Sequence, residues 1–260
     1  MAFRVVQIPV WQDNYAYILE AEDGDTALVD SPEAGPILAH LARTERSLSH
    51  IFNTHHHPDH VGSNSDLNRH FDQLEIWGGV YDHEHNRIPG QTRALAEGDH
   101  FQWGGEHCTV REIPGHTHGH IAYIWSNGCA FVGDTLFFGG CGRLFEGSPS
   151  QLDHALYDIL GSLPESTRLY CAHEYTQANL RFAMHVDSKN PELLRTVEEV
   201  ESLRAAGKPT VPSTLAVERA VNPFLRCDSP AIREAVGAEA HTPRHEVLGA
   251  LRKMKDHFKG

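Results

Sequence analysis

The strongest chemical signal in the chain is a cluster of histidine and aspartate in residues 54–60, which read T-H-H-H-P-D-H. Its H-x-H-x-D-H pattern supplies four potential metal ligands: His55, His57, Asp59 and His60. Imidazole and carboxylate groups are the donors that zinc, iron and manganese take in proteins. A predicted strand over 50–54 runs into this tight loop, so alternate side chains can be directed at one point. We expect the first two histidines to serve one ion, and the aspartate and last histidine to serve a second.

Two ions need more ligands, and three further side chains stand at the ends of predicted strands: His116, Asp134 and His173. Together with the first four they make seven ligands for two metals, and a carboxylate such as Asp134 can bridge. In the segment I-P-G-H-T-H-G-H, His118 and His120 compete with His116. We prefer His116 because it leaves the strand directly after the Pro-Gly turn, and we expect His120 to play a supporting role.

Hydrophobic periodicity predicts a mixed α/β sandwich that gives way to helices. Strands are expected over 3–10, 14–21, 26–30, 50–54, 74–77, 108–113, 121–125, 129–132 and 168–171. Helices are expected over 33–43, 61–71 and 149–163, and residues 81–92 are expected to be loop. After residue 173 the expected elements are helices over 177–186, 191–206 and 244–257, without a strand. We therefore place a boundary near residue 173.

The charge of the chain indicates which kinds of binding partner to expect. The chain has 22 Lys and Arg against 35 Asp and Glu, and a net charge of −13 disfavours nucleic acid. Residues 226–260 carry seven Lys/Arg and five Asp/Glu, so this basic segment could receive an anionic ligand. No apolar run approaches the roughly 20 residues of a membrane span, and the first 25 residues lack a signal-peptide pattern. With five cysteines and no C-x-x-C, these features favour a cytoplasmic protein with reduced thiols.

The order of the motifs resembles the metallo-β-lactamase superfamily: T-H-x-H-x-D-H, P-G-H-T-x-G-H, G-D-T-L-F and C-x-H-E-Y-T. Over the whole chain it is closer still to the glyoxalase II (hydroxyacylglutathione hydrolase) family. That resemblance rests on V-x-D-N-Y-x-Y near the start and on segments 86–90, 140–147, 173–183, 222–226 and 252–259. It implies a four-layer αββα sandwich over 1–173 with the binuclear metal site, followed by a small α-helical domain over 174–260 that contributes to glutathione binding.

The resemblance also implies a division of the ligands. His55, His57 and His116 would hold metal 1; Asp59, His60 and His173 would hold metal 2; Asp134 would bridge. Asp59 and Asp134 are the carboxylates to which we assign catalytic roles, with a hydroxide between the ions. The expected cofactor is two divalent ions per chain, zinc first, with iron or manganese as alternatives.

The family binds glutathione through residues that this chain matches in part. The implied contacts are Arg143, Tyr175, Arg252 and Lys255. Arg143 stands where some members have Lys, which keeps the charge and changes the geometry. Phe145 stands where some members have Tyr, so a hydroxyl toward the thioester end is missing.

The implied reaction is hydrolysis of S-(2-hydroxyacyl)glutathione, above all S-D-lactoylglutathione, to glutathione and D-lactate in methylglyoxal detoxification. The chain is expected to act as a monomer on this small substrate, without nucleic acid or membrane. An iron oxygenase of the same fold acting on glutathione persulfide is the first alternative, but it would need only two His and one Asp. A metal-storage protein would show scattered His tracts. Hydrolysis of β-lactams or phosphodiesters also remains open, the latter disfavoured by the acidic charge.

Overall fold

The computed structural model describes residues 3–260, which form two compact units. The first unit comprises residues up to 112 together with 119–133, and the second comprises 113–118 together with 134–260. The two domains expected from the sequence, 1–173 with the metal site and 174–260 with a part in glutathione binding, were defined by function and not by contacts alone. That division stays a prediction. Its first two residues lie outside the described part of the chain.

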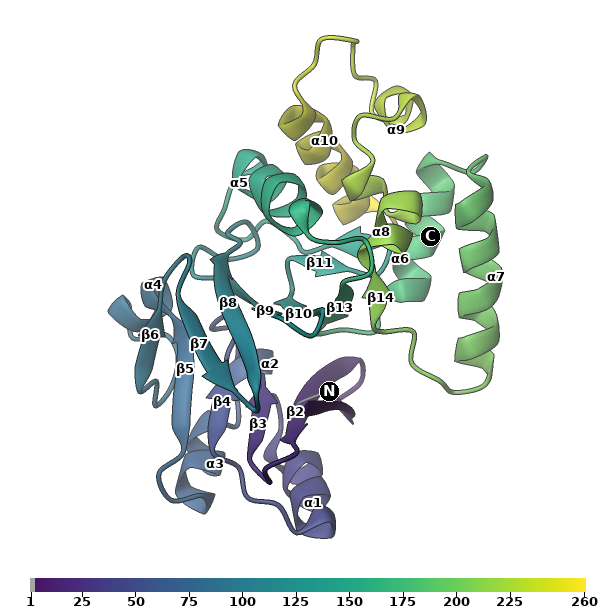
Figure 1. The fold of residues 1–260 in the computed structure, drawn as a ribbon. Helices are drawn as coiled ribbons and strands as arrows, with labels where there is room; N and C mark the ends of the chain where they lie inside the picture. Colours follow the sequence, from purple (N-terminus) through teal and green to yellow (C-terminus); the bar gives the residue numbers. More distant parts are fainter. Residues whose placement is uncertain (1–2) are drawn as a thin grey trace. The chain divides into compact units, whose positions relative to one another are not determined.

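The first unit is built on a six-stranded sheet whose spatial order follows the chain (Figure 1). Its strands are β1 (Phe3–Val10), β2 (Asn14–Ala21), β3 (Thr26–Val29), β4 (His50–Phe52), β5 (Glu75–Gly79) and β6 (Arg93–Leu95). β1 to β3 are antiparallel, and β3 to β6 are parallel. Parallel neighbours need crossover connections, and these are supplied by α1 (Ala34–Thr44), α2 (Pro58–Val61), α3 (Asn64–His70) and α4 (Val80–Glu84).

One face of this sheet packs against helices. Ile18 and Leu28 from the strands share a buried cluster with Ile37 and Leu41 of α1 and Leu67 of α3. The i, i+4 spacing of the two α1 residues gives that helix the apolar stripe that it buries.

The other face packs against a second group of strands. These are β7 (His100–Trp103), β8 (Glu106–Glu112), β9 (Ile121–Trp125) and β10 (Cys129–Gly133), antiparallel where paired. The contact is strongly aromatic: the ring of Phe52 lies 5.4 Å from Phe101 and 5.5 Å from Tyr123, centroid to centroid. Such tilted ring pairs add to the free energy gained by burying the rings. The core therefore lies on both sides of the β1–β6 sheet and fixes the end of β4, where the ligand loop begins.

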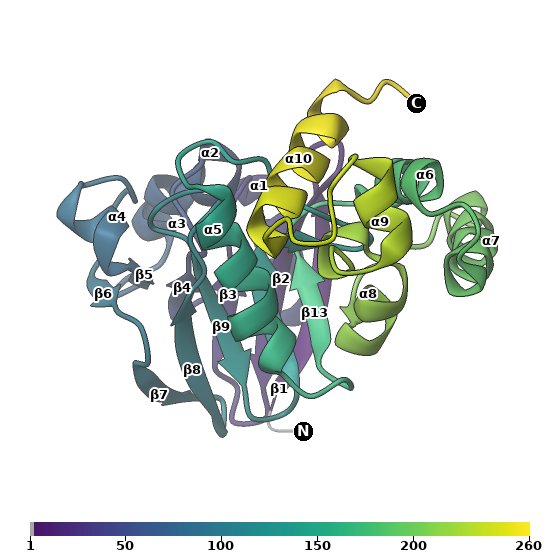
Figure 2. The ribbon, with the colours of Figure 1, turned by 90° about the horizontal axis from the view of Figure 1, so that it is seen from above.

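The second unit is largely helical (Figure 2). Its elements are β11 (Leu136–Phe137), β12 (Gly140–Cys141), α5 (Pro149–Asp153), η1 (His154–Ile159), η2 (Leu160–Ser162), β13 (Arg168–Cys171), α6 (Thr176–Val186), α7 (Pro191–Ala205), β14 (Ser213–Thr214), α8 (Leu215–Val221), η3 (Pro223–Leu225), α9 (Pro230–Ala235) and α10 (Arg244–His257). Figure 2 shows α10 beside α5. A bidentate pair of Arg244 with Asp153, at 2.7 and 2.8 Å, joins these two helices. No helix within residues 3–260 has the length and apolarity needed to cross a bilayer.

Most expected elements are confirmed, but the helix predicted over 61–71 is wrong as a single element. Of this range, Val61 is the last residue of α2 and residues 64–70 form α3, and the two are separated because the backbone at Ser63 turns away to Ser31. The Ser63 N–H donates to the Ser31 carbonyl at 2.8 Å, and the Ser31 N–H donates to the His60 carbonyl at 2.8 Å. These bonds use groups that a continuous helix would pair internally.

Two further expectations are also wrong. The loop predicted over 81–92 begins with the helix α4, in which Tyr81 stacks on His85 at 4.1 Å. The helical tail contains a strand after all, because β14 pairs with β13 through Arg168 and Leu169. A two-residue strand carries no periodic signal of its own, so only its tertiary pairing reveals it.

Candidate metal centre

The first unit places four predicted ligands in the short segment after β4, where His55 and His57 precede α2 and Asp59 and His60 lie on it. His55 and His60 are fully buried, and the Nε2 atom of His55 lies 3.1 Å from the Nδ1 atom of His57. The Nε2 atom of His60 lies 3.6 Å from the Oδ2 atom of Asp59. The loop therefore presents two neighbouring pairs of donor atoms.

Asp30 orients this loop. Its carboxylate accepts hydrogen bonds from the backbone N–H and the hydroxyl of Thr54, both at 2.8 Å. It also lies 2.8 Å from the Nδ1 atom of His60. Because an ionised carboxylate only accepts, Nδ1 carries the proton and the lone pair is on Nε2, the atom that faces Asp59. Asp59 in turn accepts from the amide of Asn14 at 3.2 Å.

The second unit gathers the other three predicted ligands around one carboxylate. The Oδ2 atom of Asp134 lies 3.4 Å from the Nε2 atom of His116, and its Oδ1 atom lies 3.5 Å from the Nε2 atom of His173. The Nδ1 atom of His116 lies 2.8 Å from the carbonyl of Arg143, which fixes the proton on Nδ1 by the same reasoning. Asp134 thus turns one oxygen to each imidazole, as a bridging carboxylate must.

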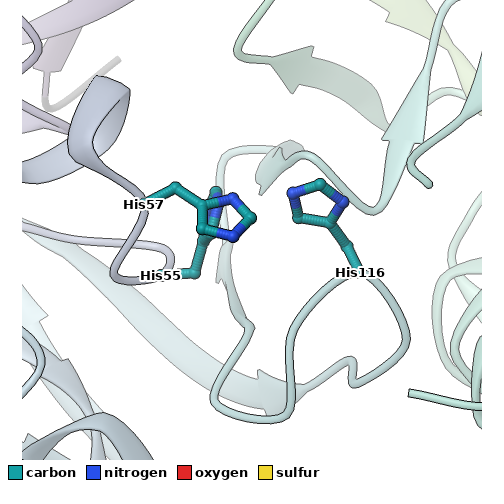
Figure 3. Close-up of side chains that lie close together, drawn as sticks. All are labelled: His55, His57 and His116. Atoms are coloured by element: carbon teal, nitrogen blue, oxygen red, sulfur yellow. The ribbon is translucent and has the colours of Figure 1, made fainter. Parts of the chain in front are cut away.

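These side chains are suited to metal ions. The first unit supplies His55, His57, Asp59 and His60, and the second supplies His116, Asp134 and His173. Figure 3 labels His55, His57 and His116. Two ligand atoms of one tetrahedral zinc ion, each about 2.0–2.1 Å from it, are about 3.3–3.4 Å apart. The four donor-atom separations given above, 3.1, 3.6, 3.4 and 3.5 Å, are close to that value. The histidine nitrogens and carboxylate oxygens present fit a dinuclear site, and they do not by themselves select the metal.

The competing histidines are not among these seven side chains. His118 is exposed and donates its backbone N–H to Glu146 at 2.7 Å. His120 is buried, and its ring stacks on that of His55 with centroids 4.6 Å apart. His120 therefore supports a predicted ligand, which agrees with the role expected for it.

Asp30 and Asn14 are the supporting residues that sequence reasoning did not single out. Asp30 ends the strand T-A-L-V-D much as Asp134 follows C-A-F-V-G, so a strand-end carboxylate was a usable signal. Asp30 also has φ of 58°, a left-handed conformation that non-glycine residues adopt rarely and often at functional sites.

The predicted substrate residues lie at several points of the second unit. Two are aromatic rings beside ligands: Tyr175 stacks on His173 at 4.6 Å, and Phe145 lies 5.2 Å from His116. Phe145 has no hydroxyl, so its ring presents only apolar surface beside His116.

The predicted cations differ in environment. Arg143 is exposed, whereas Arg252 is 5% exposed and donates to the Cys141 carbonyl at 2.7 Å and to Asp256 at 3.2 Å. Lys255 donates to the Ala178 carbonyl at 3.1 Å. Burial, reinforced by the charge of Arg252, lowers the pKa of Lys255 to about 8.

Comparison with known proteins gives the same class of protein as the sequence motifs. The metallo-β-lactamase superfamily model matches residues 10–173, and the model of the hydroxyacylglutathione hydrolase C-terminus matches 174–258. ETHE1 from Myxococcus xanthus shares the fold, with a TM-score of 0.66 and 24% identity over 98% of each chain. The di-iron-bound form of TTHA1623 gives a TM-score of 0.56 and 30% identity over 65% of this chain and 91% of that one. The predicted fold class is confirmed: a mixed α/β metallo-β-lactamase fold followed by a helical region.

Curated relatives narrow the class to one branch. A hydroxyacylglutathione hydrolase of Synechococcus sp. (strain JA-2-3B'a(2-13)) is 49% identical, covering 98% of this chain and all of its own length. One of Methylococcus capsulatus (strain ATCC 33009 / NCIMB 11132 / Bath) is 46% identical over 99% of both chains. The chain therefore belongs to the metallo-β-lactamase superfamily and, within it, to the hydroxyacylglutathione hydrolase family.

Proposed function

We propose that this protein hydrolyses S-(2-hydroxyacyl)glutathione, with S-D-lactoylglutathione as its main substrate, to glutathione and a 2-hydroxy acid. Relatives that carry the hydroxyacylglutathione hydrolase name over their full length support the reaction. The observation that carries the proposal is the set of seven predicted ligands, complete in residue type. Four lie within residues 55–60 of the first unit, and in the second unit His116 and His173 face the two oxygens of Asp134. A glutathione persulfide oxygenase with one iron would not need Asp59, His60 and His173.

We propose one binuclear centre, with His55, His57 and His116 for one ion, Asp59, His60 and His173 for the other, and Asp134 between them. Bound divalent ions would lower the pKa of water to near 7 and polarise the thioester carbonyl. The chain's own task is to hold the ligands in one protonation state and geometry. Asp30 and the Arg143 carbonyl do this for His60 and His116. Zinc is the proposed metal, and the di-iron form of TTHA1623 makes iron the main alternative.

The proposed substrate contacts follow from charge. Glutathione carries two carboxylates and one ammonium group, so Arg143 and Lys255 supply complementary charge. Arg252 holds the Cys141 carbonyl of β12, and we propose that it keeps the nearby Arg143 loop in place as well as adding charge. Tyr175 and Phe145 provide ring surface beside the ligands. We further propose a cytoplasmic monomer. The odd number of cysteines, all of them buried, fits thiols that stay reduced in the cytoplasm.

The test is the initial rate of S-D-lactoylglutathione hydrolysis by protein of known metal content. We expect kcat/KM within about 10⁴–10⁸ M⁻¹s⁻¹ and loss of activity on chelation, restored by zinc. The matched control is Asp66→Ala, an exposed carboxylate paired only with Arg69 in the contacts described, which should leave the rate unchanged. A negligible rate with two metals bound would contradict the substrate, and a negligible rate with one iron bound would favour the oxygenase.

A further inference from the structure

Three large apolar aromatic side chains of residues 3–260 are exposed. They are Trp11, Phe145 and Tyr175, with exposed fractions of 55, 61 and 37%. Phe145 and Tyr175 lie against predicted ligands of their own unit, as described above. The two other exposed large apolar side chains, Leu194 and Leu203, lie on α7. Trp11 has no role in the function proposed so far, so its position needs a reason.

Trp11 lies in a turn that is hydrogen-bonded to the segment with the predicted ligands His55 to His60. Residues 11–13 connect β1 to β2, and Val10 pairs with Asn14 across the turn. Asn14 donates its side-chain amide to Asp59, a predicted ligand, at 3.2 Å. The Trp11 backbone N–H donates to the Glu33 carboxylate at 3.4 Å, which ties the other side of the turn. The indole is therefore carried on a fixed turn, three residues from a direct contact with a ligand.

The choice of tryptophan at this position is costly for the fold. Trp11 has φ of 51°, a left-handed conformation that glycine, asparagine or aspartate adopt more readily in turns. Its indole also stays exposed, whereas Trp77, Trp103 and Trp125 are at most 6% exposed in the core. Neither backbone conformation nor core packing accounts for this residue, and residues held in such a backbone conformation cluster at functional sites.

We propose that Trp11 is a specificity-determining residue whose indole contacts the acyl group of the thioester and favours larger apolar acyl groups. The inference rests on the proposed function, because it needs a glutathione thioester in the site. Glutathione is common to all these substrates, so only the acyl end distinguishes them. A flat apolar ring on the turn that Asn14 ties to Asp59 offers surface to that end, and each CH₂ buried there is worth up to about fourfold in affinity.

The experiment compares S-glycoloyl-, S-lactoyl- and S-mandeloylglutathione as substrates of the metal-loaded protein. In Trp11→Ala we expect the mandeloyl-to-lactoyl ratio of kcat/KM to fall about four- to tenfold, with glycoloylglutathione little affected. Trp11→Phe should keep most of the ratio, since it retains a ring. Leu194→Ala is the matched control, because it removes exposed apolar surface on α7. A ratio unchanged in Trp11→Ala would overturn the proposal.

A binding measurement separates this proposal from the proposed reaction. S-Hexylglutathione is a thioether that cannot be hydrolysed, and Trp11 is the only well-exposed indole among the four in the chain. Saturating S-hexylglutathione should reduce acrylamide quenching of tryptophan fluorescence in the wild type and not in Trp11→Phe. Unchanged quenching in an enzyme that hydrolyses lactoylglutathione would reject the role of Trp11 alone. Absence of hydrolysis of every thioester would reject the proposed function and, with it, this inference.

Discussion

The two units hold their predicted ligands in opposite ways. The first unit draws four of them from a single segment of six residues, His55 to His60, a loop that runs directly into α2. The second unit draws three from separate segments: positions 116 and 134 are 18 residues apart, and positions 134 and 173 are 39 residues apart. A loop depends on its local conformation and a few supporting bonds, whereas dispersed ligands depend on every element that brings them together.

The hydrogen bonds that hold the ligand-bearing segments differ between the two units in the same way. Asp30 alone makes three polar contacts with the first-unit loop. In the second unit, the segment after Asp134 is held by remote residues: Asn222 donates to the Phe137 and Gly140 carbonyls at 3.2 and 2.9 Å. The Gly139 N–H donates to the buried Glu218 at 3.0 Å. The dispersed ligand set should therefore be sensitive to changes far from any ligand.

The largest effect is expected at Asp134, which faces both second-unit imidazoles. We expect Asp134→Ala to lose one metal per chain and to lower kcat/KM by more than the about 10–100-fold typical of an outer supporting residue. Elemental analysis and the hydrolysis rate measure the two effects, with Asp66→Ala as control. Two metals still bound per chain would count against a bridging role.

The second-largest effect is expected at Asp30, which tests how the ligand segment of the first unit is held in place. Asp30→Asn removes the charged acceptor of the His60 Nδ1–H, so His60 loses its fixed ring orientation. We expect metal affinity to fall about 10–100-fold while the fold is retained. Competition with a chelator measures the affinity, and circular dichroism checks the fold. An affinity equal to that of the wild type would show that the loop holds its ligands without Asp30.

A third prediction concerns the stability of the fold and tests Glu218, which helps to hold the segment after Asp134 in the second unit. Burial raises the pKa of Glu218 from its ordinary 4.5 to about 7, although Ser213, Asn222 and Gly139 donate hydrogen bonds to it. The folded protein holds this proton more tightly than the unfolded chain, so the stability present below pH 4.5 decreases as pH rises to about 7. The expected decrease in the free energy of unfolding is about 3 kcal/mol.

Denaturant unfolding of metal-depleted protein at pH 4.5 to 8 measures this effect. Glu218→Gln replaces the protonated carboxyl by a neutral group of the same shape, so its decrease over this range should be smaller by that amount. Parallel curves for the two proteins would show that Glu218 titrates normally.

The smallest effect is expected at Lys255, in the predicted glutathione contact. With a pKa of about 8, Lys255 is largely charged at pH 7 and largely neutral at pH 9. KM for lactoylglutathione should rise up to about tenfold over that range, with spontaneous hydrolysis subtracted. In Lys255→Arg the charge persists and KM should stay level. An equal rise in both proteins would remove Lys255 from the binding site.

Much of the fold was predictable because its signals are local. The β1 and β2 strands have the predicted bounds, and α10 spans 244–257 as expected. The division of helix 61–71 was not predictable, because it depends on hydrogen bonds from Ser31, 30 residues earlier. The helix α4 was also missed, since its short length gives no clear period.

The sequence by itself determined the ligand types, their order and the family, because the metal chemistry requires particular side chains at fixed spacings in a loop. It also favoured His116 over its neighbours as a ligand, through the Pro-Gly turn. Only the tertiary structure decided which supporting groups set the imidazole protons, since Asp30 and the Arg143 carbonyl are distant in sequence from the rings that they contact. It likewise decided that Trp11 is exposed on a turn tied to Asp59. Hydrogen bonds and burial depend on separations in space, which an amino-acid pattern does not specify.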